Sequence, residues 1–530
     1  MPNIARDGGD SAKRRGVWGW IAMCLLLAFV VLAAVGEVLV HRAATILKGR
    51  VVETLRARFD SHVELDELRV SVLRGLEVSG NGLRIYPPDD VVAAGATKPL
   101  ISLGQFSFHS DVIGLFLKPT HVGVVHVSEM TIEIPPRQMR EQGAPRRKRP
   151  DKIKIVVQEI VIDHSRLILE TDKPNKEPKE FDLDLVVLRD VGQARPWDYN
   201  ATLVNAIPRG NIHAVGTFGP WNNETPGDST VTGRYTFDHV DLNTIKGIGG
   251  LLSSIGEFSG RLNRIEVDGA TQTPNFSLDT AHHAMPLVTK FHAVVDGTSG
   301  DTYLQPVEAR LAGSEFMCSG AVTNVRGKGH IIDLNVDVPN GKIEDFLNLA
   351  VKTVPPVMTA RVETKAKLHI RPGPESVSRK IELQGEFKLR QIHFTNPKTE
   401  DKVDMLSLRA QGHPEEAKRG AADVSSRMVG QFKMADRRLT FSRLDYSLPG
   451  AEVNLSGVYS LDGKTFEFRG DVRTKAELSQ MVASWWKSWI LKPADPFFKK
   501  PGAGAVIPVK VTGTKSAPRF GIDFGRKDSK

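Results

Sequence analysis

Histidine and cysteine are the side chains that most often bind metals or carry nucleophilic and acid–base chemistry. The chain has 15 histidines and 2 cysteines. His282 and His283 are adjacent, with His292 further on, but neighbouring residues of a strand point to opposite faces and suit one metal ion poorly. Cys24 and Cys318 form no paired-cysteine motif, and no H-E-x-x-H motif occurs. The sequence predicts no metal site and no cofactor.

Glycine-rich and serine-centred motifs give no enzymatic signature either. The segment Gly247-Ile248-Gly249-Gly250 lacks the Lys-Ser/Thr of a phosphate loop and is interpreted as a glycine-bent start of a helix. No Gly-x-Ser-x-Gly is present for a hydrolase nucleophile. Carboxylates fall mostly on the polar positions of alternating segments, where they are solvated. We expect a protein that is not an enzyme; the alternative would need ionisable residues to converge in one pocket.

The elements around these residues alternate apolar and polar side chains with a period of two. Such alternation is typical of antiparallel strands with one apolar face, because buried parallel strands are apolar throughout. The pattern predicts a mainly β chain with few helices: an N-terminal transmembrane helix, then an elongated antiparallel sheet with three short helices. Later examples of the pattern lie at 331–338, 385–389 and 466–468.

The apolar phase of the early strands supplies the candidate lining of a groove. These candidates are Val63, Leu65, Leu68, Val70, Val72, Leu83, Ile85, Phe106, Phe108, Met130, Ile132, Ile134, Leu167, Leu169, Phe181, Leu183 and Leu185.

A membrane anchor is predicted near the N-terminus. Residues 17–36 carry no charge, and a bilayer core of about 30 Å needs roughly 20 apolar helical residues. Lys13, Arg14 and Arg15 precede the span, so the positive-inside rule places the N-terminus in the cytoplasm. The alternative is a cleaved signal peptide ending near Ala34-Val35-Gly36, although the apolar run is long for one. In either case everything after residue 40 is exported.

Helical periodicity appears in four places outside the span. Residues 42–59 form an amphipathic pattern, and three further helices are predicted at Leu242–Ile255, Lys342–Val354 and Ala476–Leu491. The last carries Trp485, Trp486 and Trp489. This cluster is interpreted as a helix packed on the sheet or, alternatively, as an amphipathic cap that lies on a membrane or closes a groove.

An internal repeat links two of these helices. Val267-Asp268-Gly269 is followed by Pro274, and Val511-Thr512-Gly513 by Pro518, at identical spacing. A glycine-led strand precedes each helix, at Gly233 and at Gly470. We expect a strand–helix–hairpin unit that is used at least twice, as in structures that lengthen by repetition.

Net charge, a basic run and its flanking prolines complete the predicted division of the chain into segments. The net charge of +9 is compatible with anionic headgroups and does not require nucleic acid. Arg146-Arg147-Lys148-Arg149 lies between prolines and is read as an exposed loop, with a headgroup or polyanion site as the alternative. The expected segments are a cytoplasmic tail (1–16), an anchor (17–40), a helix with the first β segment (41–135), a basic loop (136–152), a central groove segment (153–341) and a C-terminal groove segment (342–530).

Several motifs resemble the AsmA-like family. The opening, Val63-Glu64-Leu65 leading to Gly75-Leu76-Glu77-Val78 and Gly82-Leu83-Arg84-Ile85, is similar to the start of these proteins. The ending, Ile507-Pro508-Val509-Lys510-Val511-Thr512-Gly513-Thr514 and then Pro518-Arg519-Phe520, is similar to their C-terminal segment, as is Leu448-Pro449-Gly450-Ala451. The likeness extends from residue 17 to about 525, although the basic loop at 146–149 has no counterpart that we recognise.

The resemblance implies a fold and a role. AsmA-like proteins are similar to TamB, YhdP and the bridge-like lipid-transfer proteins, in which an anchored sheet curls like a taco shell around an apolar groove. It implies an inner-membrane, single-pass protein with a periplasmic bulk, which moves phospholipid between the inner and outer membranes and sustains the outer membrane. Membrane lipids, with other envelope proteins, are the implied partners. The alternative is a scaffold or assembly factor for outer-membrane components.

Overall fold

The computed structural model is mainly β, with 66% of residues in strands and 13% in helices. The chain divides into two compact units, Met1–Gln193 and Ala194–Lys530, and each is described by itself. The structure describes residues 48–49, 51–53, 55–56, 61–71, 76–93, 95–110, 120–134, 155–169, 179–192, 195–206, 208–220, 226–297, 299–325, 329–419, 424–461, 465–482, 492, 495, 499, 501–502, 504–514 and 517–522.

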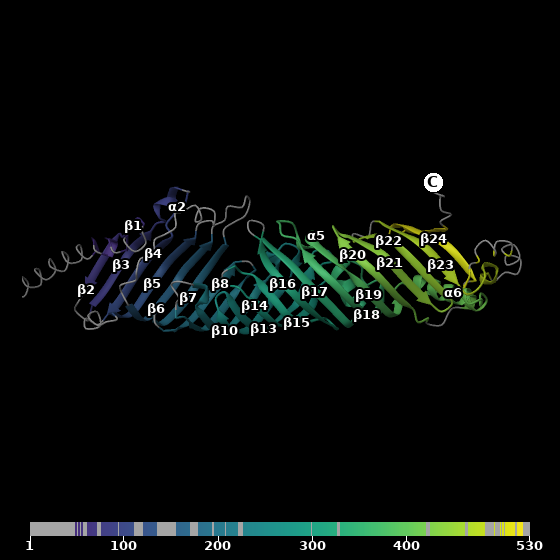
Figure 1. Cartoon of the computed structure of the whole chain (residues 1–530), viewed down its shortest axis with the longest axis horizontal. Coiled ribbons are helices and arrows are strands. Elements are labelled where there is room, and N and C mark those ends of the chain that lie inside the picture. The colour runs from purple at the N-terminus through teal and green to yellow at the C-terminus, as the bar shows by residue number, and fades with distance from the viewer. Residues whose placement is uncertain are drawn as a thin grey trace, which may run out of the picture. The chain divides into compact units, whose positions relative to one another are not determined.

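The first unit is a sheet of seven described strands with a short helix, α2 (Figure 1). Both β1 and β2 pair with β3, and the order then continues through β4, β5, β6 and β7. Its elements are β1 (Val63–Glu64), β2 (Glu67–Ser71), β3 (Leu76–Ile85), α2 (Asp89–Ala93), β4 (Ile101–Ser110), β5 (Thr120–Ile134), β6 (Ile155–Leu169) and β7 (Lys179–Val191).

The second unit is an antiparallel meander in which nearly every strand pairs with the next. The exception is β11, which with β12 pairs with β13. The strands are β8 (Trp197–Ala206), β9 (Arg209–Phe218), β10 (Thr230–Asp241), β11 (Ile248–Gly249), β12 (Leu251–Arg261), β13 (Arg264–Leu278), β14 (Met285–Val295), β15 (Thr302–Leu311), β16 (Ser314–Val325), β17 (Gly329–Lys342), β18 (Met358–Ile370), β19 (Ile381–Phe394), β20 (Arg427–Ala435), β21 (Arg438–Leu448), β22 (Ala451–Ser460), β23 (Phe466–Thr474), β24 (Ala505–Thr514) and β25 (Ala517–Ile522).

The predicted strands are confirmed wherever they fall on described residues, and their pairing is antiparallel with one exception among the described pairs. β5 and β6 run parallel, with Ile132 opposite Leu167. A parallel pair needs a long connection between its strands, and residues 135–154 provide one. Antiparallel pairing elsewhere agrees with the strict alternation of the sequence.

The structure confirms two of the predicted helices and contradicts a third. The described residues between 48 and 56 are helical, and α4 (Ile343–Ala350) lies within the predicted Lys342–Val354. The helix predicted at Leu242–Ile255 is wrong: a 3-10 turn, η3 (Leu242–Thr244), leads into β11 and β12. Gly247 and Gly250 have φ of 101° and 126°, a conformation that ends a helix, and pairing with β10 and β13 then sets the strand.

The C-terminal helix and two helices that were not predicted complete the second unit. Within Ala476–Leu491 the structure describes a 3-10 turn, η5 (Leu478–Met481), while Trp485, Trp486 and Trp489 lie outside the described residues. The helices α5 (Val377–Lys380) and α6 (Pro397–Ala410) were not expected. Two further 3-10 turns are η2 (Pro226–Asp228) and η4 (Glu416–Arg419).

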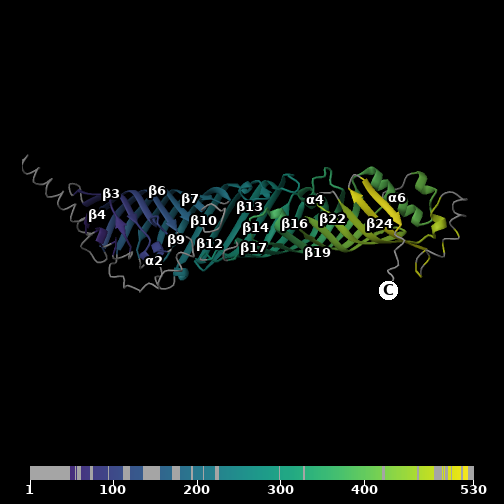
Figure 2. The same ribbon diagram turned by 90° about the horizontal axis from the view of Figure 1, so that it is seen from above.

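Most of these helices follow strands that end on one edge of the second unit. The strands β10, β17, β19 and β23 precede η3, α4, α6 and η5, and their registers place all four ends on the same side of the sheet. We call this side, which is formed by strand ends and not by an edge strand, the helix edge. Figure 2 shows α4 and α6 along the same border. On the opposite edge the described connections are mostly short, apart from the one that contains α5.

The repeat predicted from the sequence is present only in part. In four places, after β10, β17, β19 and β23, a strand is followed by helical segments and then by two paired strands. The matched motifs do not superpose, however: Val267 and Pro274 lie on one strand, β13, whereas Val511 and Pro518 lie on β24 and β25. The spacing is conserved between the copies while the strand boundaries differ.

Three sequence predictions fall outside the described residues. They are the anchor at 17–40, the basic loop at 136–152 and most of the cap helix at 476–491. Among the residues that the structure describes, no helix has the length and hydropathy to cross a bilayer. The expected segment boundaries stay predictions.

Candidate functional site

A continuous apolar face crosses the first unit. Residues directly opposite one another on paired strands point to the same face of a sheet. Here the registers bring apolar residues into line from strand to strand. The outermost row is Val63, Ile85, Ile101, Ile132, Leu167 and Phe181. Two further rows are Leu68, Gly80, Phe106, Val127, Ile162 and Val186, and Val70, Val78, Phe108, Val125, Ile160 and Leu188.

The alternation shifts by one residue along a line that crosses this unit. Gly82, Glu129 and His164 have positive φ at matching levels of β3, β5 and β6. Beyond this line the apolar side chains change from odd to even positions, or from even to odd on β5, so that Leu83 and Phe106 pack in one cluster. The apolar face continues across the line for this reason.

This shift places Leu183 and Leu185, which the alternation assigns to one face, on opposite faces of the sheet. Leu183 lies opposite Ser165, whereas Leu185 lies opposite Asp163 and is 44% exposed. Leu185 therefore belongs to the opposite, polar face. Of the other candidates, Val72 lies outside the described residues, as do the side chains of Ile134 and Leu169.

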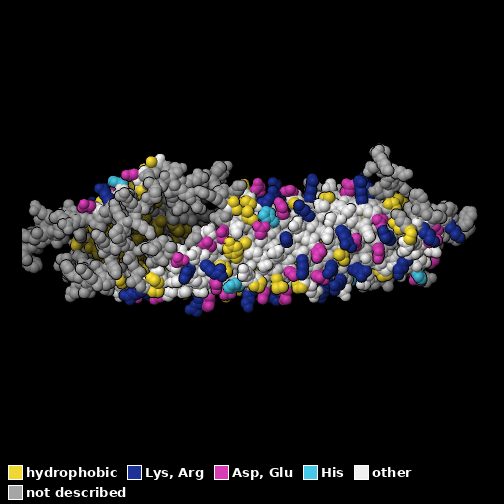
Figure 3. All heavy atoms as spheres, viewed as in Figure 1, with side chains coloured by type: hydrophobic (Ala, Val, Ile, Leu, Met, Phe, Trp, Pro, Cys, Tyr) yellow, Lys and Arg dark blue, Asp and Glu magenta, His cyan; other side chains and the backbone are white. Residues whose placement is uncertain are grey.

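The N-terminal helical residues cover the beginning of this apolar face. Val51, Val52 and Leu55 pack against a cluster that contains Val63 and Leu83. Further along, the described side chains of the outermost row, from Ile101 to Phe181, are only half-buried. Figure 3 shows a hollow with hydrophobic side chains over the strands of this unit. The face is thus apolar and remains partly accessible.

Two longer rows cross the second unit. One consists of Tyr199, Gly216, Gly233, Phe258, Val267, Ala293, Leu304, Gly320, Leu334, Leu368, Leu383, Met434, Leu439, Tyr459, Phe466 and Gly513. The next consists of Ala201, Ala214, Tyr235, Gly256, Gly269, Phe291, Val307, Cys318, Val336, Ala366, Gly385, Phe432, Phe441, Gly457, Phe468 and Val511. No charged residue interrupts either row.

Glycine and aromatic residues face one another repeatedly on the apolar faces of both units, in the long rows and beside them. A Cβ at Gly269 would lie 2.7 Å from the ring of Phe291, and one at Gly430 would lie 2.7 Å from the ring of Phe387. The same holds for Gly80 with Phe106. Each ring therefore lies over a glycine, against the sheet. We call these glycine–aromatic pairs; they keep large side chains low on the apolar face.

Helices cover only parts of the second unit's apolar face. Val338, Val362 and Leu389 are 1–3% exposed in a cluster against which Phe346 of α4 packs. A smaller cluster of Ala410, Leu448 and Ala451 lies under α6. In the two long rows, by contrast, the large side chains are half-buried and not fully buried. The chain's own helices thus fill the helix edge and leave the middle rows partly exposed.

The two edges of the second unit meet at one place. The amide of Val377, at the start of α5, donates a hydrogen bond of 2.9 Å to the carbonyl of Lys246. Lys246 precedes β11 on the helix edge, whereas α5 lies on the opposite edge, and β12 to β18 separate β10 from β19 in the sheet. A Cβ at Gly247 would lie 2.8 Å from the Val377 nitrogen, so the fit is close. We call this contact the seam; among the described residues it joins the two sides of the sheet across the strands that separate β10 from β19.

The opposite face is polar and carries ion pairs within strands and between neighbouring strands. Lys388 and Arg390 both contact Glu363, and Arg469 and Lys510 both contact Glu467. The hydrogen bond from Lys388 is the main reason that the pKa of Glu363 is lowered. Figure 3 shows Lys, Arg, Asp and Glu side chains spread over the second unit. The sheet therefore separates a charged outer face from the apolar one.

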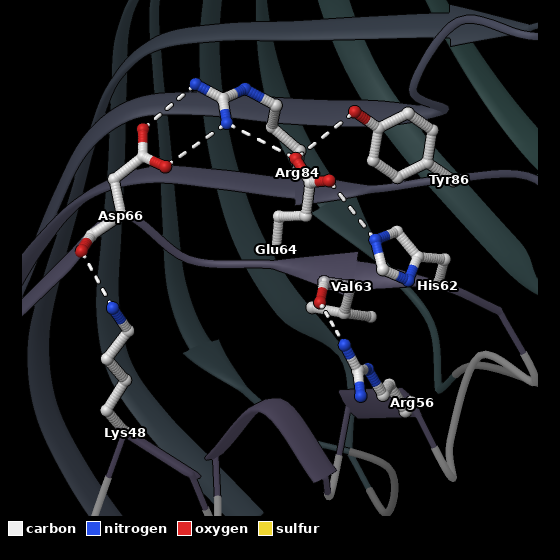
Figure 4. Close-up of polar contacts among 8 residues, drawn as sticks. All are labelled: Lys48, Arg56, His62, Val63, Glu64, Asp66, Arg84 and Tyr86. Atoms are coloured by element: carbon white, nitrogen blue, oxygen red, sulfur yellow. Dashed lines mark hydrogen bonds and ion pairs between the residues drawn. The ribbon is translucent and has the colours of Figure 1, made fainter. Parts of the chain in front are cut away.

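A polar cluster fastens the N-terminal helix to the first strands (Figure 4). Arg84 donates to both carboxylate oxygens of Asp66 at 3.2 and 2.9 Å, and to Glu64 at 3.4 Å. The hydrogen bond between Glu64 and His62 is the main reason that the pKa of Glu64 is lowered. Lys48 donates to the carbonyl of Asp66 at 2.8 Å. The carboxylates are thus occupied by structural partners.

The histidines and the free thiol occupy structural positions. His283 Nδ1 donates to the carbonyl of Asn348 in α4 at 2.8 Å, and His282 is exposed in the turn before β14. His292 pairs with Asp268 on the outer face at 2.9 Å. Cys318 is in the apolar row, and burial raises the pKa of its thiol to about 11. Among the described residues, no three His, Cys, Asp or Glu side chains group as metal ligands.

Comparison of this chain with protein-family models, with curated proteins and with solved structures found no match.

The sequence reasoning located the apolar strands and missed two features of the face. The first is the set of glycine–aromatic pairs, for which the signal was a glycine on the apolar phase, as at Gly430 between Met428 and Phe432. The second is α6, which begins with an Asn396 cap and Pro397 at the first turn, a recognisable helix start. Its apolar stripe is weak, and that is why the periodicity did not show it.

Proposed function

We propose that this chain is a single-pass, inner-membrane-anchored, periplasmic AsmA-like protein that binds or conducts phospholipid along its apolar face between the inner and outer membranes. The observation that carries the proposal is the pair of uninterrupted apolar rows in the second unit, whose large side chains stay half-buried. No enzymatic step is part of the proposal.

The energetics of hydrocarbon burial favour acyl chains as the occupant. Apolar surface gains about 25 cal/mol per Å² when it leaves water, whereas an unpaired polar group in such a place costs roughly 1–3 kcal/mol. A row that runs from Leu304 through Leu334, Leu368 and Leu383 offers continuous apolar contact without that cost. A folded protein domain would be a poorer match, because its surface also carries charged groups that would lose their water against these rows.

The enclosed space also suits a slender ligand. Sheets of about eight strands close around a bore just wide enough for side chains or one small ligand. At the seam, β12 to β18 lie between the two strands whose edges meet, which is a similar number of strands. Glycine–aromatic pairs such as Gly269 with Phe291 lower the side chains that would otherwise fill this bore. An extended acyl chain has the required width.

A matched pair of substitutions tests the proposal. Leu334→Glu places a charge in the apolar row, whereas Asn335→Glu places the same charge on the outer face of the same strand. Both variants and the parent chain would be purified from native membranes, and extracted lipids counted by mass spectrometry. We expect Leu334→Glu to lose most of its lipid and Asn335→Glu to keep it. A lipid-free parent chain, with circular dichroism confirming that it is folded, would contradict the proposal.

One observation favours the second candidate, a scaffold for outer-membrane components. Within the described part of the chain, β25 pairs with β24 alone, and its last residue, Ile522, is 48% exposed. A strand edge of this kind accepts another strand. Crosslinking from β25 that captured a protein, together with a parent chain free of lipid, would favour the scaffold.

A further inference from the structure

A ladder of hydroxyl groups interrupts the apolar face of the second unit. Ser254, Thr271 and Thr289 lie directly opposite one another on β12, β13 and β14. The hydroxyls of Thr271 and Thr289 are 2.7 Å apart, and the hydroxyl of Tyr235, from the neighbouring apolar row, is 3.1 Å from that of Ser254. We call these four residues the hydroxyl ladder.

The ladder faces the interior. Ser254 is 6% exposed, whereas Ile255, the next residue, is 60% exposed on the outer face. Lys290, next to Thr289, is likewise exposed. On either side along its row the ladder is flanked by apolar residues, Phe237 opposite Ser254 and Ala309 opposite Thr289. The ladder is thus a polar island within an apolar face.

Each hydroxyl pair of the ladder has one hydrogen that its own hydrogen bond does not use. A hydroxyl carries one donor and two acceptor sites. When two hydroxyls bond to each other, one hydrogen is used and the hydrogen of the acceptor remains free. The Thr271–Thr289 and Tyr235–Ser254 pairs therefore each hold one donor that neither contact uses. A partly buried polar site with spare donors suits a ligand that brings acceptors.

The charge of the ladder limits which acceptors fit. Its four members are neutral, and an anionic phosphate is usually bound by Arg or Lys. A neutral carbonyl oxygen is the acceptor that a hydroxyl satisfies without burying a charge. The adjoining rows, with Phe258 and Val267 beside Tyr235 and Gly256, offer apolar contact for hydrocarbon next to the ladder.

We propose that the hydroxyl ladder binds the ester carbonyls of a diacyl lipid whose tails lie on the adjoining apolar rows. This inference rests on the proposed lipid-binding function and adds the part of the lipid that is recognised. The ladder lies near the helix edge, close to the end of β10 that leads into the seam. The linkage region of the lipid is thereby held at the border of the apolar rows, and the tails extend away from it.

Diester and diether phospholipids with the same headgroup and tails test this inference, because the diether lacks the carbonyls. The purified full chain would be exchanged against an equal mixture in detergent, and the bound ratio measured by mass spectrometry. We expect the parent chain to enrich the diester about threefold to tenfold, the range that one or two neutral hydrogen bonds provide. Thr271→Val with Thr289→Val should lower the ratio towards one, because the only donor left in the ladder is then that of the Tyr235–Ser254 pair.

The outer face supplies the control. Thr217 and Thr232 form a hydroxyl pair of the same kind, at 2.8 Å, on the polar face. Thr217→Val with Thr232→Val should leave the diester preference intact. Equal binding of both lipids by the parent chain, with normal total lipid, would show that the hydroxyl ladder does not bind ester carbonyls. The proposed lipid-binding function would be unaffected by that result. Absence of both lipids from the folded parent chain would overturn the proposed function itself.

Discussion

At the scale of single residues, the apolar face depends on where side chains are absent as much as on where they are present. Gly233, Gly256 and Gly269 fall in the two long rows, and a Cβ at each would collide with a neighbouring ring or backbone atom. Rings that lie on glycine add apolar area without rising into the space above the sheet. The sequence shows these glycines but not their partners, because the partners come from the register between strands.

Gly430→Val tests the role of a glycine–aromatic pair. The new side chain would displace the ring of Phe387, which lies 2.7 Å from the Cβ position. We expect a loss of about 1–3 kcal/mol in the free energy of unfolding, as for other overpacked sites, together with reduced lipid content. Urea unfolding and lipid mass spectrometry measure the two effects.

Gly521→Val is the matched control, because nothing lies within 4 Å of the Cβ position at Gly521. An unchanged lipid content and stability in Gly430→Val would show that the Phe387 ring has room to move, and would contradict this account of the pairs.

At the scale of elements, periodicity predicted strands well and helices poorly. Alternation over 331–338 and 385–389 found β17 and β19, because one face of each is apolar along its length. Ile245, Ile248 and Leu252 have helical spacing, yet pairing with neighbouring strands prevails, as cross-strand contacts commonly override local preference. The phase shift that turns Leu185 outward was equally hidden, because positive φ at Glu129 and His164 is not a property of those residue types.

The cap of α6 offers a test at this scale. The side chain of Asn396 accepts a hydrogen bond from the Lys398 amide at 3.0 Å, which satisfies one free amide of the first turn. Asn396→Ala should lower the free energy of unfolding by about 1 kcal/mol. Equilibrium urea unfolding measures the change, with α6 helicity followed by hydrogen exchange.

Ser376 precedes α5 in the same way but makes no capping hydrogen bond through its side chain. Ser376→Ala is therefore the control and should change stability less. An equal loss in both variants would show that the Asn396 cap is not what stabilises α6.

At the scale of the whole molecule, each unit carries one face that suits hydrocarbon and one that suits water. In the first unit the row from Val63 to Phe181 keeps one register across both antiparallel and parallel pairs. In the second unit the long rows do the same through a meander of hairpins. Alternation in the sequence predicts two such faces. It does not predict the seam, which depends on how far each sheet twists and coils.

A disulfide across the seam tests whether this enclosure matters. Lys246→Cys with Val377→Cys, in a background with Cys24→Ser and Cys318→Ser, places two thiols at the contact. We expect the oxidised variant to exchange bound lipid more slowly than the same variant after reduction, because lipid could then leave only past the ends of the enclosed rows. Fluorescent lipid displacement measures the rates.

The two single-cysteine variants control for the substitutions themselves. Identical exchange rates before and after reduction, with the disulfide verified by mass spectrometry, would show that lipid does not pass between the two edges.

The seam has one more consequence, for the elasticity of the second unit. A barrel that closes by strand pairing has a fixed circumference, because widening it would break a whole ladder of hydrogen bonds. Here the described contact that joins the edges is a turn at Lys246 resting on the first amide of a four-residue helix. Separating them costs on the order of one hydrogen bond, about 0.5–1.5 kcal/mol. The two sides of the sheet can therefore separate at the seam with every strand pair intact.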